Sequence, residues 1–350
     1  MTDDDLHRLN DVLRPISPPR VLEGVYTGDQ HERILDVIKR NGPWPTIMAQ
    51  HFTTVEELMA TSNAGNADKA GSLTLDDVAT AHFRGIFGEG SIAFFPEIED
   101  CYYNSRFLQM VRDYWGARYA RPTLMLFNLC GPHHSGLNAH LDAVTFRGIR
   151  IENSPVWLQN VMGRSGLFRD YLVKMAQVIA WWYRGDNGTF TYWPDGPLGQ
   201  PKRLEHPLWN KGVVVQNEMM FHRGDPVGRA EERDVPGLKY RSVIGYDASR
   251  DEWAITTDGE VNRRYRPEEM RLLVHWSAEV YADMDEVKKN MDHSDDLTQE
   301  MVFTRLLADM RSRGVTVAEP SDPLHDQDFI RALIATYSVA PVTDWARPAA

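Results

Sequence analysis

The segments NAHLDAVTF, residues 138 to 146, and EMMFHRGDP, residues 218 to 226, decide the fold. They carry a histidine and an aspartate two positions apart, His140 and Asp142, and a distant histidine, His222. Two imidazoles and one carboxylate are the ligand set that holds iron(II) on one face and leaves three coordination positions open. Positions i and i+2 of an extended segment project to the same side, and facing sheets or a closed sheet can return a distant strand to them. The spacing therefore predicts a metal site inside a β-fold.

The histidine–aspartate pattern alone has a plainer alternative. In a chain with 12 histidines and 50 acidic residues, it also fits a surface pair and an unrelated core histidine. The flanking segments favour the metal site, because composition and turn residues predict strands on both sides of it. The predicted strands are RPTLMLFNLCGP (121–132), GTFTYWPDGP (188–197), KGVVVQNEMMFHRGDP (211–226) and GLKYRSVIGYD (237–247). The other histidines, including the loop residues His133 and His134, show no clustering that indicates a site.

With these segments in place, residues 100 to 247 resemble the iron(II)/2-oxoglutarate-dependent dioxygenases, closest to the phytanoyl-hydroxylase-like branch. The resemblance includes an aromatic-rich helix at 106–119, the strand into the histidine–aspartate pair, and the strand that delivers the distal histidine. It implies a mainly β protein with added helices, built on a double-stranded β-helix, or jelly roll. It also implies that His140, Asp142 and His222 are the ligands of Fe(II).

The same resemblance requires a cation for the far carboxylate of 2-oxoglutarate, because an unpaired buried carboxylate is costly and a guanidinium forms a matching fork. Arg241 lies on a predicted strand, and we expect it to fill this role if 229–236 is an inserted loop. Arg233 has the more usual spacing from His222 but lies in a charged, exposed segment. Asn128 is expected either to contact the co-substrate or to be satisfied by backbone.

The rest of the chain predicts helical additions to one catalytic core. Residues 1–99 are expected to form a helical and loop extension, with a capped helix at 26–43. Residues 100–266 are expected to form the core, with a helical insertion near 154–185 and a hairpin at 251–265, and residues 267–350 a C-terminal helical extension. The polar stretch 54–80 fits either a lid or a surface connection.

Composition excludes several classes of protein. The 350 residues are 42% hydrophobic and contain no long apolar span, so we expect no membrane segment. A net charge of −12 makes nucleic acid a poor partner. Two cysteines without a signal peptide are typical of a reducing cytoplasm. The C-terminal helices are expected to pack on the core or across a homodimer interface.

The resemblance implies that 2-oxoglutarate and O2 are consumed to give succinate and CO2 while a small molecule is oxidised. Hydroxylation is the expected outcome, since related halogenases lack the carboxylate that Asp142 supplies. Desaturation, epoxidation and ring formation are open. The aromatic residues of 154–185 hint at a small substrate from secondary metabolism. Two alternatives are a cupin-like metalloenzyme without 2-oxoglutarate, favoured if neither Arg233 nor Arg241 reaches the pocket, and a non-catalytic binding module.

Overall fold

The computed structural model describes residues 3–62, 72–134, 139–339 and 341. Its α-helices are α1 (Asp3–Val12), α2 (Gly28–Asn41), α3 (Ile47–His51), α4 (Val55–Ser62), α5 (Glu99–Tyr102), α6 (Ser105–Trp115), α7 (Val156–Ser165), α8 (Met284–Met291), α9 (Gln299–Ser312) and α10 (Gln327–Tyr337). Short 3-10 turns are η2 (Pro96–Ile98), η3 (Arg169–Tyr171), η4 (Ala230–Glu232) and η5 (Pro267–Glu269).

The strands form three antiparallel sheets. They are β1 (Arg20–Glu23), β2 (Trp44–Pro45), β3 (Phe83–Glu89), β4 (Ile92–Ala93), β5 (Tyr119–Cys130), β6 (Met175–Tyr183), β7 (Phe190–Tyr192), β8 (Lys202–Arg203), β9 (Leu208–Val215), β10 (His222–Gly224), β11 (Val243–Asp247), β12 (Glu252–Thr257), β13 (Glu260–Tyr265) and β14 (Arg271–Tyr281).

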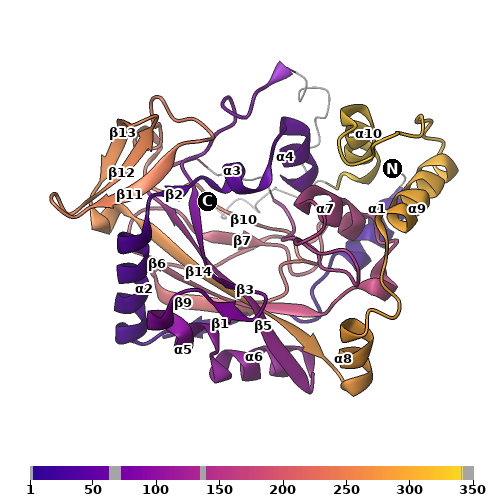
Figure 1. The fold of residues 1–350 in the computed structure, drawn as a ribbon, viewed down its shortest axis with the longest axis horizontal. Coiled ribbons are helices and arrows are strands. Elements are labelled where there is room, and N and C mark those ends of the chain that lie inside the picture. The colour runs from indigo at the N-terminus through magenta and orange to yellow at the C-terminus, as the bar shows by residue number, and fades with distance from the viewer. Residues whose placement is uncertain (1–2, 63–71, 135–138, 340, 342–350) are drawn as a thin grey trace, which may run out of the picture.

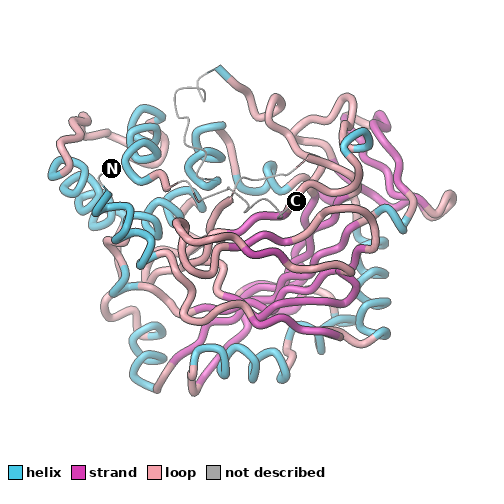
Figure 2. The backbone as a smooth tube through the Cα atoms, turned by 180° about the vertical axis from the view of Figure 1, so that it is seen from behind, coloured by secondary structure: helices cyan, strands magenta, loops and turns pink. Residues whose placement is uncertain are grey.

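The core is a jelly roll made of a large and a small sheet. The large sheet has the order β1-β9-β6-β14-β5-β3-β4, and the small sheet the order β10-β7-β8. The two sheets face each other (Figure 2). Side chains of β5, β6 and β9 meet those of β7 in one buried cluster, which includes Trp181 and Phe190. The predicted jelly-roll fold is confirmed, with helices added around it.

The central strands of the large sheet are buried on both faces. Along β6, Trp181 points into the cluster between the sheets, whereas its neighbours Ala180 and Trp182 belong to a second core under the helices. On β14, Val274 and Trp276 face that second core, and the odd-numbered positions face the jelly-roll interior. Side chains that alternate between two buried surfaces give a continuous apolar run.

Two sequence predictions are wrong because these strands are buried on both faces. The second half of 154–185 is not helical, because residues 175–183 form β6; only α7 is the expected helix. The chain after Pro267 is not helical at first, because residues 271–281 form β14, the strand between β5 and β6. The core therefore extends past residue 266, and the C-terminal helices begin with α8. A continuous apolar run does not distinguish a buried strand from a buried helix.

Helices α2, α5 and α6 cover the outer face of the large sheet (Figure 1). Helix α2 begins at a capping box, in which the Thr27 hydroxyl accepts from Gln30 N and the Gln30 side chain accepts from Thr27 N. Its apolar face buries Ile34, Val37 and Ile38. The helix predicted at 26–43 is confirmed, and so is the one predicted near 106–119, as α6. The N-terminal 99 residues also add β1, β3 and β4 to the sheet.

On the other side, α1, α4, α7, α9 and α10 form a helical layer (Figure 1). Their apolar faces build a separate core, in which Trp157, Leu306 and Leu333 are almost fully buried within the chain. The polar stretch 54–80 includes α4, but 63–71 lie outside the described residues. Among the helices that the structure describes, none is both long and apolar enough to cross a membrane.

The third sheet, of order β13-β12-β11-β2, lies at one edge of the molecule (Figure 1). It contains the predicted hairpin at 251–265 as β12 and β13. Its three long strands are all inserted between β10 and β14, so the chain leaves the jelly roll after His222 and returns to it at Arg271.

Candidate metal centre

Backbone pairing brings the two parts of the predicted triad together. His140 and His222 form an antiparallel bridge, with N–H groups and carbonyls exchanged in two hydrogen bonds of 3.0 Å. Asp142 N donates to Asn217 O at 3.2 Å, which continues the contact toward the end of β9. The segment after β5 thus runs beside β10 at the edge of the small sheet.

The three side chains converge. One ligand atom from each of His140, Asp142 and His222 lies within 4.8 Å of the other two. His222 Nε2 is 3.5 Å from Asp142 Oδ1, and the two imidazole centroids are 4.6 Å apart. His222 Nδ1 lies 3.0 Å from Met220 O. Since a carbonyl only accepts, Nδ1 carries the proton, and the lone pair of Nε2 is free to face the centre.

A divalent metal ion fits this donor set. Asp142 Oδ2 is shielded from solvent and has no hydrogen-bond partner among the described residues. Burial acts to raise the pKa of Asp142, but the adjacent His222 outweighs it and holds the pKa below its ordinary value. The carboxylate is therefore ionised and carries an unsatisfied oxygen, which is costly unless a cation meets it. His140, Asp142 and His222 would hold iron(II) here.

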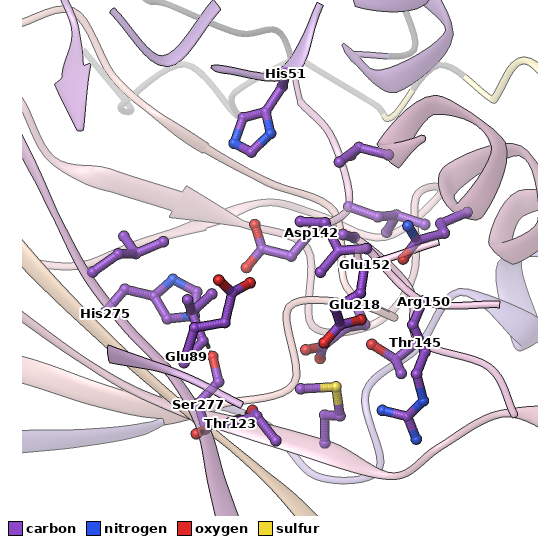
Figure 3. Close-up of a pocket in the computed structure, with 18 of the residues that line it drawn as sticks. His51, Glu89, Thr123, Asp142, Thr145, Arg150, Glu152, Glu218, His275 and Ser277 are labelled. Atoms are coloured by element: carbon purple, nitrogen blue, oxygen red, sulfur yellow. Dashed lines mark hydrogen bonds between the residues drawn. The ribbon is translucent and has the colours of Figure 1, made fainter. Parts of the chain in front are cut away.

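Two cavities meet at the triad. The larger encloses about 1170 Å³, including space open to solvent, and is lined by His140 and Asp142 (Figure 3). The smaller is lined by all three triad residues. His275, on β14, lines both cavities, and burial lowers its pKa to about 4, so the ring is neutral at physiological pH.

Two arginines, Arg84 and Arg271, line the smaller cavity together with the carboxylates Asp142 and Asp225, and Asp225 is ion-paired with Arg203 and Arg223. Arg271 lines the cavity from the first position of β14, where it is paired with Cys130 of β5. The side chain is buried, and its Nε donates to Gly188 O at 2.7 Å. No carboxylate of the described residues forms an ion pair with it. Arg84 lines the same cavity and donates from Nε to Asn128 Oδ1 at 2.8 Å. A buried guanidinium without a carboxylate is suited to bind an anionic ligand.

The structure does not bring the predicted arginines to the triad. Arg241 is exposed and forms a bidentate ion pair with Asp258, with Nε–Oδ1 and Nη2–Oδ2 distances of 3.0 and 2.6 Å. Arg233 donates to the carbonyls of Val227 and Gly228. Neither lines either cavity. The supposed inserted loop at 229–236 is only part of a longer insertion that carries the third sheet. Asn128 does lie on the wall of the smaller cavity, with its side chain bonded to Arg84.

Several residues of the site were missed in the sequence. His82 and His133 line the smaller cavity, with ring centroids 5.3 Å apart, and His51 lines the larger one. Glu218 lines the larger cavity, and its Oε1 accepts from Gln177 Nε2. Burial, and then the nearby charge of Asp142, raise the pKa of Glu218 to about 8. The sequence feature that could have indicated such residues is a polar side chain within or beside an apolar run. His275 lies in LLVHW, and Glu218 directly precedes MMF.

Comparison with known proteins gives matches among solved structures alone. No protein-family model matches the chain, and no curated protein matches it. The similar solved structures include an oxidoreductase of the 2OG-Fe(II) oxygenase family from Burkholderia pseudomallei, at 11% identity over 80% of this chain and 92% of that one, with a TM-score of 0.39.

Two others are described in similar terms. HygX from Streptomyces hygroscopicus, with nickel, 2-oxoglutarate and hygromycin B bound, has 11% identity over 80% of this chain and 88% of that one, with a TM-score of 0.38. The viral collagen prolyl hydroxylase of Paramecium Bursaria Chlorella virus-1, in its 2OG complex, has 8% identity over 76% and 97%, with a TM-score of 0.37. The solved structures similar to this chain thus include 2OG-Fe(II) oxygenases, the family that the sequence resembles.

Proposed function

We propose that this protein is an iron(II)- and 2-oxoglutarate-dependent oxygenase that hydroxylates a small organic molecule. The observation that carries the proposal is the position of the triad in the wall between two cavities of different character. The smaller cavity contains the buried Arg271, which donates to Gly188 O but forms no ion pair with the described carboxylates. The larger cavity has room for a second molecule. An anionic co-substrate and an organic substrate can therefore reach the same metal ion from different sides.

Each residue has a defined part in this proposal. His140, Asp142 and His222 hold the metal and leave its remaining positions open toward the cavities. Arg271 binds the far carboxylate of 2-oxoglutarate as a fork, and the apolar walls Leu273 and Ile179 exclude water from the chain of the keto acid. Bound iron(II) supplies the chemistry that couples oxidative decarboxylation of 2-oxoglutarate to C–H hydroxylation. In the balanced reaction, R–H, O2 and 2-oxoglutarate give R–OH, succinate and CO2.

The condition that favours the cupin-like alternative is met, because neither Arg233 nor Arg241 lines the pocket. We nevertheless prefer the 2-oxoglutarate-dependent oxygenase, because Arg271 offers a buried cation in place of those two residues. The non-catalytic alternative requires that the triad does not bind metal, which the unsatisfied Asp142 Oδ2 argues against.

The test is a spectrum of the anaerobic protein with iron(II), before and after addition of 2-oxoglutarate. We expect a weak visible charge-transfer band with the keto acid and, on admission of oxygen, release of succinate. The Asp142→Ala variant should show neither. Bound iron with no band would overturn the proposal in favour of the cupin-like enzyme. Absence of bound iron would support the non-catalytic module instead.

A further inference from the structure

The larger cavity has acidic side chains that form no ion pair with the described residues. Glu89, at the end of β3, Glu152, after Arg150, and Glu218, before β10, all line it (Figure 3). Within the described part of the chain, none of these three carboxylates forms an ion pair. Glu218 is only 4% exposed, and its Oε2 is buried without a hydrogen-bond partner among the described residues. Leaving a carboxylate oxygen unsatisfied in a cavity wall is costly in the absence of a ligand.

A second buried acceptor lines the same cavity. Gln159, on α7, is fully buried, and its Nε2 donates to Ser154 O at 3.0 Å. This contact fixes the orientation of the amide, since a carbonyl only accepts. Its Oε1 is then left without a partner. Gln159 Oε1 can only accept, and Glu218 Oε2 accepts when the carboxyl is ionised, so a cationic donor satisfies both atoms and favours the ionised form of Glu218.

Three arginines line the larger cavity, and Arg84, which also lines the smaller one, donates to the neutral side chains of Asn128 and His51. Arg121 and Arg150 both bind Glu279, which is almost fully buried. Arg150 also donates from Nη2 to Asn290 Oδ1 at 2.7 Å. Arg121 and Arg150 therefore already have an anionic partner, whereas no described residue forms an ion pair with Glu89, Glu152 or Glu218.

We infer that the larger cavity binds a small molecule carrying a protonated amine, with the ammonium group held by Glu218 and Gln159 and attracted by Glu89 and Glu152. This inference rests on the proposed function, because it takes the larger cavity as the substrate site. An ammonium has three donors and no acceptor, which matches the unsatisfied atoms of the wall.

The test uses amine and alcohol pairs that share a skeleton: 1,6-diaminohexane and 1,6-hexanediol, cyclohexylamine and cyclohexanol, glucosamine and glucose. Binding to the full-length protein with Zn(II) and 2-oxoglutarate is measured by ligand-observed NMR, which needs no turnover. We expect the amine to bind at least tenfold more tightly than the alcohol in one or more pairs. The substitutions Glu218→Gln and Glu89→Gln should each reduce that ratio at least fivefold.

Glu260→Gln, on the exposed part of β13, is the matched control, because it changes the net charge equally outside the cavity. Equal or absent binding of both members in every pair would overturn the inference, as would a preference unchanged in both cavity variants. If Glu218→Gln does not fold, the partly exposed Glu89 still provides the test. An amine preference without a 2-oxoglutarate band would refute the proposed function alone, and a band without the preference would refute this inference alone.

Discussion

Arg271 and Cys130 are paired at one end of the β14–β5 ladder, and this register puts the guanidinium in the cavity that His222 also lines. The pairing follows from the alternation of β14, whose odd-numbered residues face the jelly-roll interior. Strand β14 pairs with β5 from Arg271 onward and with β6 from Leu272 onward, so the position of its first residue is defined by the register. In the proposed function, Arg271 is therefore a preorganised anion-binding residue.

Replacing Arg271 with Gln should weaken 2-oxoglutarate binding to the metal-loaded protein. Loss of one partner of a buried charge pair costs about 2–5 kcal/mol, so we expect a dissociation constant about 30- to 5000-fold higher. The measurement is titration of the keto acid under anaerobic conditions with iron(II). Arg241→Gln removes the same charge from an exposed ion pair and should leave the affinity unchanged. Equal effects of the two variants would place the anion site elsewhere.

The His222→Ala variant should lose metal affinity by at least about 100-fold, since even substitution of residues behind the ligands costs 10- to 100-fold. Equilibrium dialysis against iron(II) under nitrogen measures the effect. His134→Ala is the control, because His134 is exposed and bonded to Asp234 away from the triad. Similar affinities in the two variants would exclude His222 from the ligand set.

His51 should make the fold sensitive to acid. Its Nε2 accepts from Arg84 Nη1 at 2.9 Å. Burial first, and then the charge of Arg84, lower its pKa from 6.5 to about 3. The unfolded chain binds a proton at this residue near pH 6.5, whereas the folded chain does not. The stability contributed by neutral His51 is therefore complete above pH 6.5 and is lost as the pH falls toward 3, by up to about 1.4 kcal/mol per pH unit.

The substitution His51→Gln keeps an acceptor for Arg84 and removes the titrating group. Urea unfolding of the metal-free protein between pH 7 and 5 should show a shallower decline in stability for this variant than for the wild type. The exposed His325 provides a control substitution, His325→Gln. A decline as steep as that of the wild type would show that His51 is not held neutral in the folded state.

Gly212 should tolerate no side chain. A Cβ at this position of β9 would lie 2.3 Å from Ile179 O and 2.7 Å from Val25 Cγ2. Because the first of these atoms is backbone of the neighbouring strand β6, we expect Gly212→Ala to lower the free energy of unfolding by about 1–3 kcal/mol. Gly28→Ala, where a Cβ meets nothing within 4 Å, should be neutral in the same denaturation experiment. Equal midpoints would mean that β9 can shift to accommodate the methyl group.

The triad was predictable from sequence because its chemistry depends on residue type and short spacing. A histidine and an aspartate two apart, followed by a histidine at a turn, leave few alternatives once the neighbouring strands are recognised. The jelly roll was implied by the family that these segments resemble. The capped helix α2 was predictable from Thr27 and Gln30 because capping is local.

The remaining parts depend on contacts that are distant in sequence. Strands β6 and β14 were predicted as helix because both of their faces are buried, which removes the alternation that identifies a strand. Arg271 was missed for a related reason, since its role follows from the register of β14. Glu218 and Gln159 were missed because their significance lies in what they do not contact. Such a property exists only in the folded chain.

The third sheet, inserted between His222 and Arg271, has a consequence for how such proteins are found. The segment between His222 and Arg271 contains β11, β12 and β13. The number of residues between the proposed distal ligand and the proposed anion-binding arginine therefore depends on the length of this inserted segment. A search motif with a fixed interval between these residues would pass over this protein. A motif should instead specify an arginine at the first position of the strand that pairs with β5, the strand preceding His140 and Asp142. Such a motif would find this protein whatever the length of the inserted segment.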